Sequence, residues 1–160
     1  MHLRSVKYYD QNAARLAQQY HSAEVTGLHT LLGRWLPSGG DLLEIGCGAG
    51  RDAAFMASHG CKVVACDASE SMLQYSRDYL QKVEESDSVS LLQAEFPLPT
   101  NHSLLSRRFD SVIAMAMLMH IPENELFNFA YQSSMAHQQP GKPALGINSR
   151  EMALLLLATD

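Results

Sequence analysis

The sequence predicts an α/β fold: a doubly wound, mainly parallel sheet with helices on both faces. Short apolar runs alternate with longer segments in which apolar residues recur at helical spacing. The chain has 160 residues, 46% of them hydrophobic and 18% charged, which suits a single core between layers of secondary structure. We expect one domain, with a helical cap over residues 1–37 and the α/β core over residues 38–160.

The N-terminal part of the chain predicts two helices and then a strand. Apolar residues recur at near-helical spacing over residues 13–20, and a second amphipathic segment covers residues 24–36 until Pro37 stops it. Residues 41–45 form a short apolar run bounded by glycines, which is typical of a strand buried on both faces.

A helix, a second strand and another helix follow. Residues 51–59 predict a helix that ends at Gly60, a residue suited to a left-handed cap. Residues 61–66 predict a buried strand, and residues 69–84 predict a helix with Ser69 as its N-cap.

Three more strands are expected in the second half of the chain. Residues 89–93 and 109–115 predict the third and fourth strands, and Pro122 is expected to begin a helix that continues to about residue 135. After a loop, residues 144–148 predict a fifth strand. Since crossovers between parallel strands are right-handed, this order places helices on both faces of the sheet.

Three alternate glycines, Gly46, Gly48 and Gly50, follow the first predicted strand. Ligands of open parallel sheets lie outside the carboxyl ends of the strands, usually at the first strand-to-helix turn. Without Cβ atoms there, a ligand can lie almost against the main chain, and amides of the next helix point at it. Asp67 follows the second strand, where a carboxylate can accept hydrogen bonds from both hydroxyls of a ribose. The pattern predicts an adenosine-type ligand.

Two details favour S-adenosylmethionine over a dinucleotide. The spacing is Gly-x-Gly-x-Gly, whereas a dinucleotide site prefers Gly-x-Gly-x-x-Gly. Glu44, two residues before the first glycine, would repel a pyrophosphate and attract an ammonium or sulfonium group. A nicotinamide-dependent oxidoreductase is therefore disfavoured, and the glycines taken alone would fit a purely structural turn.

Four segments resemble the class I S-adenosylmethionine-dependent methyltransferases of small-molecule type, which have a Rossmann-like fold. These segments are residues 8–13, 43–50, 64–73 and 109–115, and the likeness covers about residues 8–135. It implies an enzyme that transfers a methyl group from S-adenosylmethionine to an unidentified small molecule and releases S-adenosylhomocysteine.

The resemblance also implies a set of cofactor-binding residues. Glu44 would lie near the methionine moiety and Asp67 would hold the ribose. Met115 would close the pocket, and Tyr9 would fold over the cofactor. Glu95 stands where family members carry an Asp that meets the adenine. The full set is Tyr9, Glu44, Gly46, Cys47, Gly48, Gly50, Asp67, Ala68, Met72, Glu95, Phe96 and Met115. Singly, Met72 and Met115 also fit core positions, and Tyr9 fits either packing or a lid.

The sequence identifies no catalytic residue. In-line displacement at a sulfonium needs alignment and exclusion of water, and a general base only if the acceptor must lose a proton. His120 and His21 are the candidates, although capping or packing is the favoured role for His120. The histidines have no metal-ligand spacing, so no metal is predicted.

The C-terminal part departs from the resemblance. Residues 139–143 look like a damaged version of the usual Pro-Gly-Gly turn, and too little chain follows for the usual final strand hairpin. We expect an uncovered sheet edge and hence a homodimer or poor solubility. The shortening also supports the alternative of a catalytically impaired relative that only binds the cofactor, as a binding or regulatory module.

Charge and cysteine usage narrow the partners and the compartment. The net charge of −5 argues against nucleic acid as the main partner. Three cysteines without a C-x-x-C pair suit a reduced compartment. The N-terminus lacks an apolar signal region, and the apolar run over residues 152–158 is too short for a bilayer. We therefore expect a cytoplasmic protein with no membrane partner.

Overall fold

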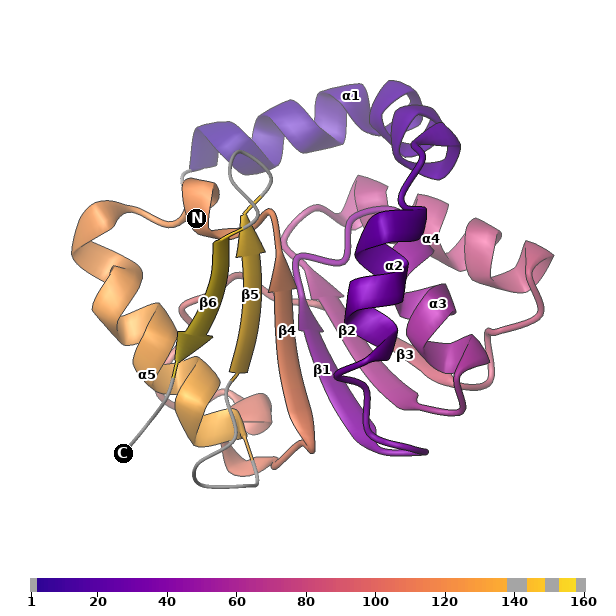
Figure 1. The fold of residues 1–160 in the computed structure, drawn as a ribbon. Coiled ribbons are helices and arrows are strands. Elements are labelled where there is room, and N and C mark those ends of the chain that lie inside the picture. The colour runs from indigo at the N-terminus through magenta and orange to yellow at the C-terminus, as the bar shows by residue number, and fades with distance from the viewer. Residues whose placement is uncertain (1–2, 138–143, 149–152, 158–160) are drawn as a thin grey trace.

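The computed structural model describes residues 3–137, 144–148 and 153–157, and within them six strands form one sheet (Figure 1). The strand order is β3-β2-β1-β4-β5-β6. The first five strands are parallel, and β6 pairs antiparallel with β5. The strands are β1 (Asp41–Ile45), β2 (Lys62–Asp67), β3 (Val89–Gln93), β4 (Ser111–Met115), β5 (Ala144–Asn148) and β6 (Ala153–Leu157). This confirms the predicted doubly wound sheet, whose order reverses between β1 and β4.

Helices precede and connect the strands. The α-helices are α1 (Leu3–Ser22), α2 (Thr26–Gly33), α3 (Arg51–Ser58), α4 (Glu70–Lys82) and α5 (Leu126–Ala136), and the 3₁₀ turns are η1 (Ser103–Ser106), η2 (Leu118–His120) and η3 (Glu123–Glu125). Gly60 has φ +83° just beyond α3, as the sequence predicts. Pro122 is the N-cap of η3, which leads directly into α5, so the helical segment predicted to begin at Pro122 begins one residue later and as a 3₁₀ turn.

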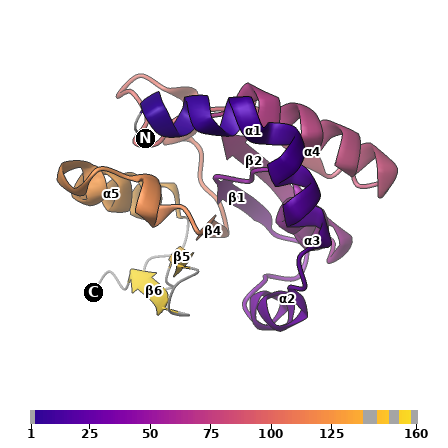
Figure 2. The same cartoon turned by 90° about the horizontal axis from the view of Figure 1, so that it is seen from above.

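Two core clusters lie on opposite faces of the sheet, because successive strand residues point to opposite sides. Leu42 and Val63 pack with residues of α3 and α4. Leu43 and Val64 pack on the other face with residues of α5, including Phe129. Figure 2 shows α5 on one side of the sheet and α3 and α4 on the other.

The C-terminal apolar run forms a strand that the sequence analysis did not predict. In β6, residues 153–157 pair with all five residues of β5, from Ala144 opposite Leu157 to Asn148 opposite Ala153. In the described part of the chain, β6 therefore takes the edge position beside β5. The predicted turn over residues 139–143 lies outside the described residues.

Helix α1 lies across the carboxyl ends of the central strands (Figures 1 and 2). Its apolar face, formed by Ala13, Leu16 and Ala17, packs against Ala49 in the glycine loop and Met72 in α4. The N-terminal segment thus covers the edge of the sheet where the sequence predicts a ligand. No described helix is both long and apolar enough to traverse a membrane.

Candidate functional site

The loop between β1 and α3 turns tightly on its three glycines. Gly46, Gly48 and Gly50 have φ angles of +77°, +55° and +80°, a region that residues with a Cβ rarely adopt. The N–H groups of Gly46 and Cys47 both donate to the carbonyl of Cys66, at 2.7 and 3.0 Å. The loop is therefore fixed to the end of β2.

The three glycines differ in what surrounds them. A Cβ on Gly46 would lie 2.8 Å from Sδ of Met117, and a Cβ on Gly50 would lie 2.2 Å from Oγ of Ser76. Around Gly48 the nearest such atoms are at 3.7 Å or more, which is ordinary contact distance. Gly46 and Gly50 thus allow close packing within the chain, while Gly48 lies in the least crowded part of the loop.

Glu44, the fourth residue of β1, is a buried carboxylate with an unsatisfied oxygen. Glu44 is only 2% exposed, and its Oε2 has no hydrogen-bond partner among the described residues. Burial, and then the nearby Asp52 and Asp67, raise the pKa of Glu44 well above its usual range. Such a group favours an added hydrogen-bond donor or positive charge.

Asp67 ends β2 and joins the glycine loop to the start of α4. Its Oδ2 accepts from the N–H of Gly48 and its Oδ1 from the N–H of Ser69, both at 2.9 Å. Burial raises the pKa of Asp67, and hydrogen bonds from the backbone N–H groups of Ser69, Gly48 and Ala68 oppose that rise. The carboxylate therefore lies directly beside the glycine loop, as the sequence predicts.

Ser69 is the N-cap of α4, which confirms the sequence prediction, and it also anchors α1. Its hydroxyl accepts from the N–H of Met72 at 3.1 Å and donates to Oδ1 of Asp10 at 2.5 Å. Asp10 further accepts from the N–H of Ser71. These contacts hold the first half of α1 over the β2–α4 connection.

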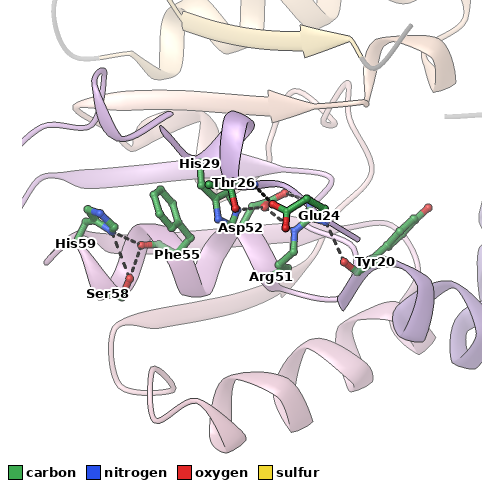
Figure 3. A network of polar contacts seen from close by, with 9 residues as sticks. All are labelled: Tyr20, Glu24, Thr26, His29, Arg51, Asp52, Phe55, Ser58 and His59. Atoms are coloured by element: carbon green, nitrogen blue, oxygen red, sulfur yellow. Dashed lines mark hydrogen bonds and ion pairs between the residues drawn. The ribbon is translucent and has the colours of Figure 1, made fainter. Parts of the chain in front are cut away.

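A second polar network attaches the N-terminal helices to α3 (Figure 3). Arg51 donates to both carboxylate oxygens of Asp52 at 2.9 Å and to the carbonyl of Tyr20 at 2.9 Å. His29 Nε2 lies 2.7 Å from Oδ1 of Asp52, and its ring stacks on Phe55. This network was not predicted, because the contacts that join the N-terminal helices to α3 link residues more than twenty positions apart: Tyr20 with Arg51 and His29 with Asp52.

Replacing Asp52 with Asn should destabilise the fold at neutral pH by about 2 kcal/mol, since it leaves Arg51 and His29 without their anion. Burial raises the pKa of Asp52, but the hydrogen bonds from His29 and Arg51 outweigh it and lower the pKa overall. The stability that this carboxylate contributes is therefore lost as the pH falls below about 4, the usual value for an unfolded Asp. Urea unfolding at pH 7 and pH 3 measures both effects; an equal loss at both pH values would contradict the assignment.

Tyr9 of α1 contacts His120 of η2. The Tyr9 hydroxyl lies 3.1 Å from Nε2 of His120, and the two rings are edge to face with centroids 5.5 Å apart. Burial raises the pKa of Tyr9, and a hydrogen bond with Tyr20 and then the Asp67 carboxylate add to the rise. The same carboxylate acts on His120, whose pKa is lowered by burial. Tyr9 therefore faces the strand ends.

The other predicted site residues lie in mixed surroundings. Ala68 and Met72 are buried, Met72 beneath α1, and Cys47 is a buried thiol whose pKa is raised by burial. Phe96 is buried in the core with its ring edge-on to Phe129.

Glu95 and Met115 lie at the ends of the neighbouring strands. Glu95 is exposed and lies just past the end of β3, beside the end of β2, because the N–H of Ala94 donates to the carbonyl of Asp67 at 3.0 Å. Met115 is half-buried at the end of β4 and packs against the cluster on the α3 face. The structure thus gathers the glycines, Glu44, Asp67 and Tyr9, while Phe96 packs inward.

The gathered groups suit a ligand that has both a cation and hydroxyl groups. Asp52 and Asp67 are both close enough to Glu44 to raise the pKa of Glu44, and Arg51 is already held by Asp52. The Asp67 carboxylate accepts backbone N–H groups of Gly48, Ser69 and Ala68, and since a carboxylate offers about four acceptor sites it can still accept from a hydroxyl donor. Among the described residues no group of His, Cys, Asp and Glu side chains is arranged to hold a metal ion.

Comparison with known proteins gives consistent matches. The sequence profile of a family described as "Methyltransferase domain" matches residues 42–140. A ubiquinone biosynthesis O-methyltransferase of Thiobacillus denitrificans is 33% identical over 95 residues, which is 56% of this chain and 39% of that protein. Another, of Xanthomonas axonopodis pv. citri, is 27% identical over 106 residues, covering 64% and 41%. The chain thus spans about two fifths of the length of these curated relatives.

Solved structures share the fold. The glycopeptide N-methyltransferase MtfA in complex with S-adenosyl-L-homocysteine superposes with a TM-score of 0.65 and 22% identity, over 78% of this chain and 52% of that one. A TehB-like methyltransferase from Corynebacterium glutamicum has a TM-score of 0.65 and 17% identity, over 91% and 73%. At these identities the likeness concerns the fold.

Proposed function

Because the chain belongs to the methyltransferase-domain family, with a match over more than half of its length, we propose that it transfers a methyl group from S-adenosylmethionine to a small-molecule acceptor. Membership of this family agrees with the resemblance to class I methyltransferases noted in the sequence. The cofactor would bind at the carboxyl ends of β1 and β2, beneath α1. We further propose that residues 1–37 act as a cap on the core formed by residues 38–160.

The observation that carries this proposal is the unsatisfied carboxylate of Glu44. Its Oε2 has no partner among the described residues, although the side chain lies in the interior and beside two other acids. A buried anion of this kind is costly unless a cation or donor approaches it. The ammonium and sulfonium groups of S-adenosylmethionine provide positive charge, so the site fits this cofactor better than a pyrophosphate.

The chain's own residues would bind and orient the ligand. Asp67 would accept the ribose hydroxyls, and Gly48 would allow the ligand to lie against the loop. Met72 and Ala68 offer apolar surface for the adenine, and Tyr9 would cover it from α1. The bound cofactor supplies an activated methyl group on sulfur, so the protein's share is to align the acceptor and exclude water.

The acceptor and the oligomeric state belong to the proposal. We propose a small molecule, because the net charge of −5 disfavours polyanions.

We also propose that the chain forms a homodimer through the sheet edge at β6, which is the last strand of the described sheet. Light scattering should give twice the mass of one chain; a single-chain mass at micromolar concentration would contradict the dimer.

Replacing Asp67 with Asn should weaken binding of S-adenosylhomocysteine about tenfold to a hundredfold, since a charge-assisted hydrogen bond contributes about 1.5–3 kcal/mol. Isothermal titration calorimetry of the wild type and the variant measures the loss. Because Asp67 also holds the N–H groups of Gly48 and Ser69, thermal unfolding of both proteins is recorded to show that the variant is folded.

The matched control is Asp87→Asn, which removes an exposed carboxylate beyond α4 and should leave the affinity unchanged. NADH serves as the competing ligand and should bind weakly or not at all. Equal dissociation constants for wild type and Asp67→Asn, or tighter binding of NADH, would overturn the proposed function.

A further inference from the structure

We propose that the outer face of α5 binds the same face of α5 in a second copy of this chain, so that the two helices pair antiparallel across a two-fold axis at Tyr131. The inference rests on the homodimer in the proposed function and goes further in naming a surface and its contacts. In Figures 1 and 2, α5 and β6 lie at the same end of the molecule, so this surface and the sheet edge at β6 face the same side.

The outer face of α5 is an apolar stripe. Phe127, Tyr131 and Met135 recur at intervals of four residues, which is the spacing of neighbours along one face of a helix. Their exposed fractions are 83%, 55% and 44%. The buried residues of α5 include Phe129, which packs in the core cluster on the sheet. The helix therefore attaches to the sheet by one face and leaves the stripe open to a partner.

The composition of α5 favours a partner surface of the same kind. None of its eleven residues is charged. By contrast α4, on the other face of the sheet, exposes Glu70 and Asp78. Exposed helix faces are ordinarily polar, whereas the centres of protein interfaces are enriched in aromatic residues and Met and depleted of charge. In a chain of net charge −5, a second copy can approach this face without meeting like charges on it.

The stripe is arranged so that it matches itself. A two-fold interface brings the same patch of both copies together in reversed direction. Tyr131 is the middle residue of α5, and Phe127 and Met135 lie four positions to either side of it. Antiparallel pairing about this centre places Tyr131 against Tyr131 of the partner subunit and Phe127 against Met135 of the partner subunit. Aromatic pairs and sulfur–aromatic contacts are both favourable.

Charges at the two ends of α5 also fit the antiparallel arrangement. Glu125 is the N-cap residue of the helix. At the other end the N–H of Phe109 donates to the carbonyl of Ala136 at 2.8 Å, and the exposed Arg107 lies over the Phe109 ring, 5.0 Å from its centroid. Reversed pairing brings Glu125 towards the partner subunit's Arg107, and it sets the two helix dipoles in opposite directions. A parallel arrangement would bring like charges together.

Cross-linking at the two-fold axis tests the pairing directly. Tyr131→Cys places a thiol where α5 meets itself, so air oxidation catalysed by copper phenanthroline should join most of the chains in pairs. The native cysteines Cys47, Cys61 and Cys66 are free and buried. Gln81→Cys, at an exposed position of α4, is the control and should give little covalent dimer at the same concentration.

Analytical ultracentrifugation measures what each contact contributes. Phe127→Ser should raise the Kd of the dimer at least tenfold, and because this side chain is exposed the variant should keep its fold, which circular dichroism checks. Arg107→Glu and Glu125→Arg should each weaken the dimer. An equimolar mixture of these two variants should associate more tightly than either alone, since both charge pairs are then opposite again. A mixture no tighter than its components would overturn the antiparallel pairing.

The remaining outcomes separate this inference from the proposed function. A dimeric wild type that Phe127→Ser leaves intact, with Tyr131→Cys cross-linked no more than Gln81→Cys, overturns the inference and leaves the homodimer through β6. A wild type that is a single chain at micromolar concentration overturns both, and binding of that single chain to phosphatidylcholine vesicles would assign the stripe to lipid instead. Calorimetry with S-adenosylhomocysteine tests cofactor binding separately, and wild type and Phe127→Ser should bind it equally.

Discussion

Replacing Glu44 with Gln should stabilise the ligand-free protein and, at the same time, weaken S-adenosylhomocysteine binding. The wild-type carboxylate is buried, lacks a partner for Oε2 and lies near Asp52 and Asp67. A neutral amide of the same shape removes the cost of burying that charge, about 1–3 kcal/mol, and should raise Tm by several degrees. The same change removes the anion proposed to attract the cofactor.

The pH dependence of the stabilisation identifies its cause. Burial raises the pKa of Glu44 in the folded protein. Below the pKa of an unfolded Glu, near 4.3, the carboxyl is protonated in both states and does not reduce the free energy of unfolding. As the pH rises above that value, the reduction in the free energy of unfolding grows. The variant should therefore gain most at pH 7 and little at pH 4. Glu123→Gln, at an exposed glutamate, is the control and should change neither stability nor affinity. A destabilised Glu44→Gln with full affinity would contradict the account of this residue.

Replacing Gly50 with Ala should destabilise the fold by about 3 kcal/mol, a large part of the stability of an ordinary domain. Gly50 has φ +80°, which costs a residue with a Cβ about 1–2 kcal/mol. The added Cβ would also lie 2.2 Å from Oγ of Ser76 and 3.2 Å from the Cα of the same residue. Since that Cα belongs to the backbone of α4, relief requires α3 and α4 to move apart.

Gly60→Ala is a matched control for the conformational part of this loss. Gly60 has φ +83°, almost the same angle, but a Cβ there meets nothing within 4 Å. We expect it to cost about 1 kcal/mol. Denaturant unfolding of both variants gives the steric contribution by difference. Equal losses at the two positions would show that the contact with Ser76 is unimportant.

The strands of the sheet were the most predictable part of the fold. Residues 41–45, 89–93 and 144–148 form β1, β3 and β5 with the predicted bounds, because each is a short apolar run bordered by residues that end strands. The position of Asp67 beside the glycine loop also followed from the sequence, since the carboxyl ends of neighbouring parallel strands meet at one edge.

Contacts between distant segments were not predictable. The sequence shows α1 as an amphipathic helix, but which apolar surface it covers depends on the folded arrangement, here Ala49 and Met72. The pairing of Tyr9 with His120 joins residues 111 positions apart. The strand β6 was missed because a run of small and branched apolar residues has no alternation, and its role depends on the neighbouring β5.

The most direct test of the central claim is a crystal structure of the chain with S-adenosylhomocysteine. The account predicts the ribose hydroxyls on the Asp67 carboxylate, the amino-acid part of the ligand along the loop from Gly46 to Gly50 towards Glu44, and the sulfur facing His120. A ligand seated elsewhere, or one in this place with Asp67 turned away from the ribose, would contradict it.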